Sequence, residues 1–288
     1  MNIKIITDRL KTYKPASQRE ELNALKEIIQ ELALCALART NFFDGAAFQG
    51  GSCLRIIHGM NRFSEDLDFI ARAENQTFAW APFLQVLQRE FVLYGFEFEV
   101  IDRSKASNPI KAAFLKDTSI GQVLVLTHKR TVADKQTLQI KFEIDIAPPP
   151  HSGFETHYLD FPYAFSIITQ DLPSLFASKC HAVLCRPFIK GRDWYDFIWY
   201  VSKKIKPNLK HLAAALEQLG PWKNQAIVLS EQWFIQTMRE KIISIDWQET
   251  KSDIENFLHP HEREALKVWS TDFFLATLKK LEGYLLPG

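Results

Sequence analysis

The sequence predicts an α/β (α+β) protein in which a mixed-sheet core is followed by a helical C-terminal region. Between residues 46 and 146, short segments alternate apolar and polar residues or are rich in β-branched residues, as is typical of strands. From Asp171 to the end, apolar residues recur with helical spacing. The change of pattern falls near residues 150–170. We therefore expect two domains, an α/β core at 1–165 and a helical domain at 166–288.

The core begins with a helix. Ser17-x-x-Glu20 is a capping box, and the apolar residues after it fall on one helical face: Leu22, Leu25, Ile28, Ile29, Leu32 and Cys35. Residues 46–48 then form a short strand that stops at Gly50-Gly51. Ser52 is placed to N-cap a helix carrying Leu54, Ile56 and Ile57.

The rest of the core contains one more helix and several strands. Residues 67–70 predict a strand and residues 77–94 an amphipathic helix, with Pro82 tolerated only near its first turn. Alternation or β-branched content predicts strands at 96–101, 110–115, 122–127 and 138–146, the last ended by three prolines at 148–150. In the C-terminal region, helices are expected at 171–185, 194–203 and 209–219, with further helical segments to the end.

The composition excludes several classes of protein. Lys and Arg total 35 against 34 Asp and Glu, a net charge of +1, which argues against a strongly basic nucleic-acid-coating protein but leaves room for a local basic patch. The four cysteines contain no C-x-x-C pair and lie in apolar stretches, so they predict buried thiols rather than disulfides or zinc ligands. The histidines form no ligand-spaced cluster. No apolar run could span a bilayer, so we expect a soluble cytoplasmic protein with no membrane partner.

The motif most indicative of function is a glycine turn followed by two acids. Gly50, Gly51 and Ser52 precede a helix, where an anion such as a phosphate is well received. Asp66 and Asp68 are spaced i and i+2, which places both on one face of a strand. Carboxylates in this arrangement can hold Mg²⁺ next to a phosphate. The alternatives are a plain turn with a helix cap and two solvent-facing aspartates.

A third carboxylate comes from the alternating run at 140–146. Glu143 and Asp145 both lie on the polar face of this strand, together with Lys141. Either acid could complete a metal site, or the face could simply meet solvent. Arg55 and Arg62 flank the glycine turn, and each is expected either to contact phosphate or to form an ion pair.

Lys179 is unusual because it lies on the apolar stripe of the helix predicted at 171–185. A lysine in that position is costly unless it reaches a cleft or an acidic partner. The alternative is a lysine that snorkels to the surface from a domain seam. Asp193 and Asp196 open the next helix, where a helix dipole favours acids in any case.

Four blocks in this order resemble the AbiEii/AbiGii nucleotidyltransferase toxin family, which has a DNA polymerase beta-like nucleotidyltransferase core. They are Gly50-Gly51-Ser52-x-Leu54-Arg55, Gly59-x-x-Arg62-x-Ser64-Glu65-Asp66-Leu67-Asp68-Phe69, Leu175-Phe176-Ala177-x-Lys179-x-x-Ala182-x-x-x-Arg186 and Lys190-x-Arg192-Asp193-x-Tyr195-Asp196. Each block alone is a common chance match, whereas four in order are specific.

The resemblance implies a nucleotidyltransferase toxin with a separate antitoxin protein as its partner. It implies that Asp66, Asp68 and Glu143 hold two Mg²⁺ ions, that Asp193 is a base or orienter, and that a nucleoside triphosphate (NTP) is the substrate. The residues expected to bind the triphosphate are Gly50, Gly51, Ser52, Arg55 and Lys179. The expected acceptor is an RNA 3′ end such as that of tRNA. The alternatives are a hydroxyl of a protein or small molecule as acceptor, and an inactive nucleotide-sensing module.

Overall fold

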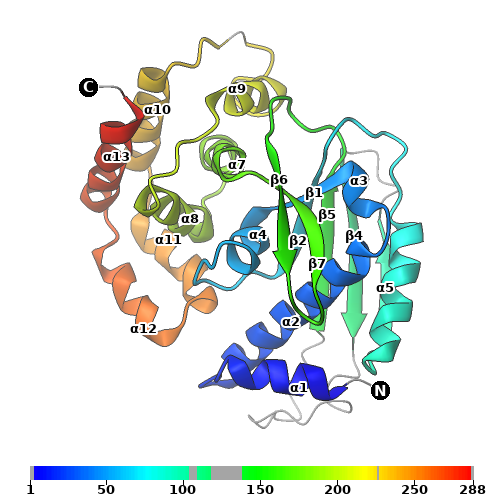
Figure 1. Cartoon of the computed structure of the whole chain (residues 1–288). Coiled ribbons are helices and arrows are strands. Elements are labelled where there is room, and N and C mark those ends of the chain that lie inside the picture. Colours follow the sequence, from blue (N-terminus) through cyan, green and yellow to red (C-terminus); the bar gives the residue numbers. More distant parts are fainter. Residues whose placement is uncertain (1–2, 104–108, 118–137, 226, 287–288) are drawn as a thin grey trace. The chain divides into compact units, whose positions relative to one another are not determined.

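The computed structural model describes residues 3–103, 109–117, 138–225 and 227–286 (Figure 1). The strand predicted at 122–127 lies outside these residues. The chain divides into two compact units, the first formed by residues 1–148 and 155–169 and the second by residues 149–154 and 170–288. No single boundary along the chain separates these two units, because residues 155–169 return to the sheet of the first unit after the proline run.

The first unit is built on a seven-stranded mixed sheet with the order β3-β4-β5-β2-β1-β7-β6. Its strands are β1 (Ala46–Gln49), β2 (Asp66–Ala71), β3 (Phe98–Asp102), β4 (Ile110–Asp117), β5 (Leu138–Asp145), β6 (Phe154–Leu159) and β7 (Phe165–Gln170). Strands β1 and β2 pair antiparallel, whereas β2 pairs with β5 in parallel. The predicted α/β class with a mixed sheet is confirmed.

In the described residues of the first unit, the helices are α1 (Ile3–Thr12), α2 (Gln18–Ala38), α3 (Phe42–Gly45), α4 (Gly50–Ile56) and α5 (Ala81–Leu93). The predicted capping box begins α2, where the Ser17 side chain accepts from the Glu20 N–H and Glu20 accepts from the Ala16 N–H. Helix α4 packs on β1 and β2, and α2 packs against α5. The apolar face of α2 is buried, with Leu25, Ile28 and Ile29 fully covered.

The second unit is helical in the residues described. It contains α7 (Leu172–Cys185), α8 (Gly191–Ser202), α9 (Leu209–Gln218), α10 (Glu231–Ile243), α11 (Trp247–Ile254), α12 (Pro260–Arg263) and α13 (Thr271–Leu285), with short 3₁₀ turns at Glu255–Phe257 and Glu264–Val268. Asp171 caps α7 by accepting from the Ser174 N–H. An aromatic cluster joins α8, α11 and α13, where the rings of Trp247 and Phe274 stack with centroids 3.9 Å apart.

Three sequence predictions of local structure were wrong or incomplete. Strands β6 and β7 and helices α1 and α3 were not predicted. The helix expected from residue 77 begins at Ala81, so that Pro82 falls within its first two positions. Ser52 is not a helix cap, because α4 already begins at Gly50, after Gln49 in an extended conformation.

Candidate active site

The glycine turn forms the junction between β1 and α4. Gly50 has a φ of +77°, a conformation that only glycine adopts without strain. A Cβ at this position would lie 2.4 Å from the Asp68 Oδ2 atom. The main chain of the turn therefore touches the Asp68 carboxylate directly, and the absence of a side chain makes this approach possible.

Asp66, Asp68 and Glu143 share one face of the sheet. The parallel register of β2 and β5 places Asp68 opposite Glu143 and Asp66 opposite Lys141, and on its other side Asp68 is opposite Gln49 of β1. Because paired residues in register point to the same face, the three predicted acids are brought together within the first unit. Glu143 forms an ion pair with Lys141 at 2.8 Å, in which both side chains are about one-third exposed.

Asp145 occupies a different environment from Glu143. It is opposite Ile70 rather than an acid, and its Oδ1 atom accepts a hydrogen bond from the Ala147 N–H at 3.0 Å. The side chain thus closes a turn at the end of β5. Of the two candidates for the third carboxylate, Glu143 is the one next to Asp68.

Ser52 is fully buried, and its hydroxyl donates to the main-chain carbonyl of Asp66. This bond ties the first turn of α4 to the start of β2. The hydroxyl therefore fixes the distance between the glycine turn and the acids. This contact gives Ser52 a positioning role that the sequence did not reveal.

The two arginines that flank the turn make internal contacts. The Arg55 guanidinium forms an ion pair with Glu27 at 2.8 Å and donates to the main-chain carbonyl of Asn61 at 2.6 Å, which favours the ion-pair alternative for this residue. Arg62 is 2% exposed and lies over Gly51, where an added Cβ would meet its Nη2 atom at 2.6 Å. Gly51 thus allows a buried cation to approach the turn.

In the second unit, Lys179 has two acidic partners. Its Nζ atom lies 2.8 Å from Asp193 and 2.8 Å from Asp196, and the Asp196 side chain is fully buried. Arg186 forms an ion pair with the other oxygen of Asp193. The sequence predicted that a lysine on this stripe needs an acidic partner, and the first turns of α8 supply two.

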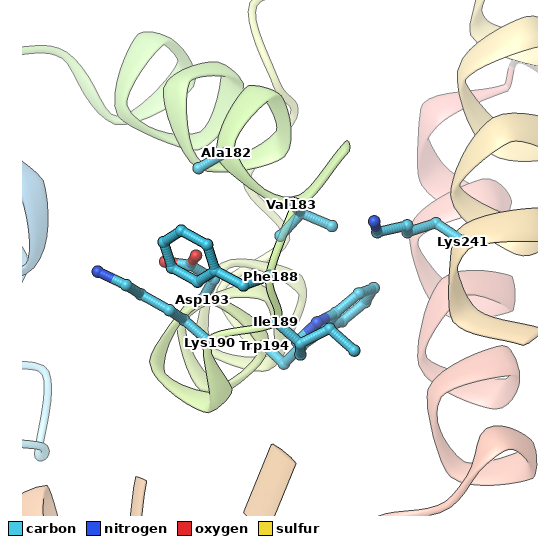
Figure 2. A pocket seen from close by; sticks show the side chains of 8 residues that line it. All are labelled: Ala182, Val183, Phe188, Ile189, Lys190, Asp193, Trp194 and Lys241. Carbon is cyan, nitrogen blue, oxygen red and sulfur yellow. The ribbon is translucent and has the colours of Figure 1, made fainter. Parts of the chain in front are cut away.

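Asp193 and Asp196 differ in accessibility. Asp193 lines a small pocket together with residues of α7 and the α7–α8 loop, including Phe188 and Lys190 (Figure 2). Burial, with Arg186 and Arg192 nearby, lowers the pKa of Lys190. Asp193 borders this pocket, whereas the Asp196 side chain is fully buried.

Comparison with known protein families decides the assignment. The family described as the nucleotidyl transferase AbiEii toxin of type IV toxin–antitoxin systems matches residues 32–277. The chain belongs to this family. The AbiEii assignment makes the chain a nucleotidyltransferase toxin of a type IV toxin–antitoxin system, and it confirms the resemblance seen in the four motifs.

Solved structures share the fold at low sequence identity. A candidate nucleotidyltransferase from Helicobacter pylori is 15% identical, with a TM-score of 0.51 over 90% of this chain and 93% of that one. The nucleotidyltransferase toxin MenT4 from Mycobacterium tuberculosis is 14% identical, with a TM-score of 0.50 over 98% of this chain and 99% of that one. No curated protein sequence matches the chain. Within the residues described, no helix is long and apolar enough to cross a membrane.

Proposed function

We propose that this AbiEii-family chain transfers a nucleoside monophosphate from an NTP to the 3′ end of an RNA, such as tRNA, in a Mg²⁺-dependent reaction. The observation that carries the proposal is the sheet register, which lines up Gln49, Asp68 and Glu143 on three adjacent strands. The Gly50 main chain lies against the middle residue of this row. A main-chain turn that lies against a carboxylate can hold a phosphate group beside metal ions that the carboxylate binds.

The donor set fits Mg²⁺. Asp66, Asp68 and Glu143 offer carboxylate oxygens from two neighbouring strands, and Mg²⁺ prefers oxygen ligands shared with substrate phosphates. When bound at such a site, Mg²⁺ ions neutralise charge on the transferred phosphoryl group and lower the pKa of the attacking hydroxyl. Lys141 forms an ion pair with the Glu143 carboxylate, and a bound Mg²⁺ ion would compete with this lysine for the carboxylate.

The chain's own groups take three further roles in the proposal. The main-chain N–H groups at the start of α4 receive the triphosphate, and Ser52 keeps this turn in register with β2. Lys179 binds the triphosphate tail, with Asp193 and Asp196 holding the ammonium in place before the substrate arrives. Asp193, which borders a pocket, orients the acceptor hydroxyl or takes its proton.

The proposed setting is the cytoplasm, where NTPs and tRNA are both present, with a cognate antitoxin protein as partner. A hydroxyl of a protein or small molecule is the alternative acceptor. An inactive nucleotide-sensing module is the alternative without catalysis. The three acids on one face argue against it, because their mutual repulsion serves no purpose in a site that binds no cation.

Labelled transfer assays separate these possibilities. The purified chain is incubated with each labelled NTP and Mg²⁺, in one arm with total RNA and in the other with RNase-treated lysate. Labelling of RNA by the wild-type chain but not by the Asp66→Asn variant supports the proposal. Labelling of protein alone would show that the acceptor is a protein hydroxyl and not RNA. If the wild-type chain binds NTP but labels nothing in either arm, the sensing alternative stands.

Growth tests the toxin role separately. Expression of the wild-type chain is expected to slow bacterial growth, and expression of Asp66→Asn at the same protein level is not. If cells that express the wild-type chain and cells that express Asp66→Asn grow at the same rate, the transfer reaction is not what makes the chain toxic.

A further inference from the structure

A cluster of two histidines and a glutamate lies in the first unit, away from the acids of β2 and β5 in the sequence. His58 follows α4, whereas Glu155 and His157 belong to the edge strand β6. Each of the three side chains offers a ligand atom, and these atoms all lie within 4.8 Å of one another. The spacing of the histidines in the sequence does not predict this cluster, because His58 is about a hundred residues from Glu155 and His157 and β6 was not predicted.

We propose that His58, Glu155 and His157 bind a divalent transition-metal ion of the zinc type. Two imidazole nitrogens and one carboxylate are a common three-residue ligand set for zinc, in which a water molecule takes the fourth position. Imidazole ligands select against Mg²⁺, which prefers oxygen. The site is therefore chemically distinct from the three-carboxylate face.

The geometry requires only small movements to bind an ion. In a tetrahedral site with bonds of about 2.0–2.1 Å, ligand atoms lie about 3.4 Å apart. The His157 Nε2 and Glu155 Oε1 atoms are 2.9 Å apart, and the two imidazole rings meet edge to face with centroids 5.3 Å apart. The spacing i and i+2 directs Glu155 and His157 to the same face of β6.

Burial supports the proposal. His58 and His157 are both half-buried, which limits the positions their rings can take, and Glu155 is exposed enough to admit an ion from solvent.

An ion at this position would cross-link the edge strand β6 to the residues that follow α4. His58 lies directly after the helix whose first residues form the glycine turn. Binding to the folded state alone stabilises the protein, by an amount that grows with the ion concentration above its Kd. A Zn²⁺ concentration of about 100 times Kd should raise the Tm by about 5–10 °C.

The test uses the full chain with Asp66→Asn and Asp68→Asn, so that the three-carboxylate face contributes no binding. After removal of metals with a chelator, the protein is titrated with Zn²⁺ by calorimetry and with Co²⁺ by visible absorption. We expect one equivalent to bind, intense Co²⁺ bands typical of four-coordinate geometry, and the rise in Tm. Because no transfer reaction is measured, the result does not depend on the proposed function.

Three variants are added to this background, together with a control. His58→Ala and His157→Ala should weaken binding by more than about 100-fold, since even outer-shell partners of metal ligands contribute 10–100-fold. Glu155→Gln alters an exposed side chain, so it should fold normally and still weaken binding. The control is His259→Ala/His261→Ala, which removes a stacked histidine pair in the second unit.

The control variant should bind as tightly as its parent. Absence of stoichiometric Zn²⁺ binding by the parent would overturn the proposal. So would binding that survives both His58→Ala and Glu155→Gln, or binding that is lost in the His259→Ala/His261→Ala control.

Discussion

Replacement of Gly50 by alanine should lower transfer activity by about a hundredfold while leaving most of the fold intact. The residue has a φ of +77°, and a Cβ added to it would lie 2.4 Å from the Asp68 Oδ2 atom and 2.9 Å from the Asp68 Cβ atom. Because the second of these atoms belongs to the base of the side chain, a rotamer change alone does not relieve the contact. The turn and β2 must move apart.

The size of the effect follows from these numbers. An ordinary van der Waals separation is about 3.5 Å, so the carboxylate and the turn must separate by about 1 Å. A misplacement of about 1 Å at a reacting centre costs about a hundredfold in rate. The left-handed backbone adds a folding cost of about 1–2 kcal/mol, which lowers the Tm by about 2–8 °C in a domain of this size.

Gly45→Ala is the matched control. Gly45 lies at the end of α3, immediately before β1, and a Cβ there would have no neighbour within 4 Å. Both variants are assayed for transfer of labelled NTP and for thermal unfolding. Gly45→Ala should differ from the wild type by less than about 1 kcal/mol in stability and should keep its activity.

One result would refute the reasoning. A Gly50→Ala protein that transfers nucleotide within a few fold of the Gly45→Ala control would show that contact between the turn and Asp68 is not needed. If the Gly50→Ala protein is unfolded at the assay temperature, its rate is measured at a lower temperature, below its Tm, beside the Gly45→Ala control. Weak binding of NTP by the folded variant would locate the defect in the turn itself.

Further predictions concern the charged groups. Asp66→Asn and Asp68→Asn should each lower transfer by about a thousandfold with an unchanged Tm, since several kcal/mol of transition-state stabilisation is lost; a rate within tenfold of wild type would contradict the metal assignment. Lys141→Met removes a cation that competes for Glu143, so the Mg²⁺ concentration for half-maximal rate should fall by up to about fivefold, and a rise would assign Lys141 to phosphate binding. Lys179→Met should raise the KM for the NTP and destabilise the second unit by about 3 kcal/mol, and an unchanged KM would make this lysine purely structural.

The last prediction changes what the sequence had suggested. From the apolar stripe alone, loss of a scaffold lysine should be neutral or stabilising. The fully buried Asp196 side chain reverses this expectation, because Lys179→Met removes a cation 2.8 Å from it. Stability therefore no longer separates the two interpretations, and the KM does. The double variant Lys179→Met/Asp196→Asn should recover the lost stability without recovering the KM.

Local signals predicted local structure well. The capping box before α2 and the alternation in β5 each depend on residues within a few positions of one another, and both are present. Strand β6 escaped prediction because an edge strand has no consistently buried face, and its Tyr158 is 81% exposed. The start of α4 differs from the prediction because Gly50, with a φ of +77°, turns the chain into the helix two residues before Ser52.

The sequence proposes the members of the candidate site but not how they are arranged. The glycine turn and the acid pair are near neighbours in sequence, so their residue types and spacing indicate the chemistry. The choice between Glu143 and Asp145 depends on the β2–β5 register, which pairs Asp68 with Glu143 across a long sequence separation. Likewise, the pairing of Lys179 with Asp193 and Asp196 depends on how α7 and α8 pack.

The parallel pairing of β2 with β5 also has a consequence for the order of events during synthesis. The glycine turn and the first two acids are complete once β2 has been made, but Glu143 is translated much later. At about 5–20 residues per second, the interval between Asp68 and Glu143 lasts about 4–15 s. Throughout that interval the nascent chain contains Asp66 and Asp68 but not Glu143, and β2 does not yet have β5 to pair with. The row formed by Asp66, Asp68 and Glu143 is thus completed only when β5 has been made, and a chain that ends before residue 143 lacks it.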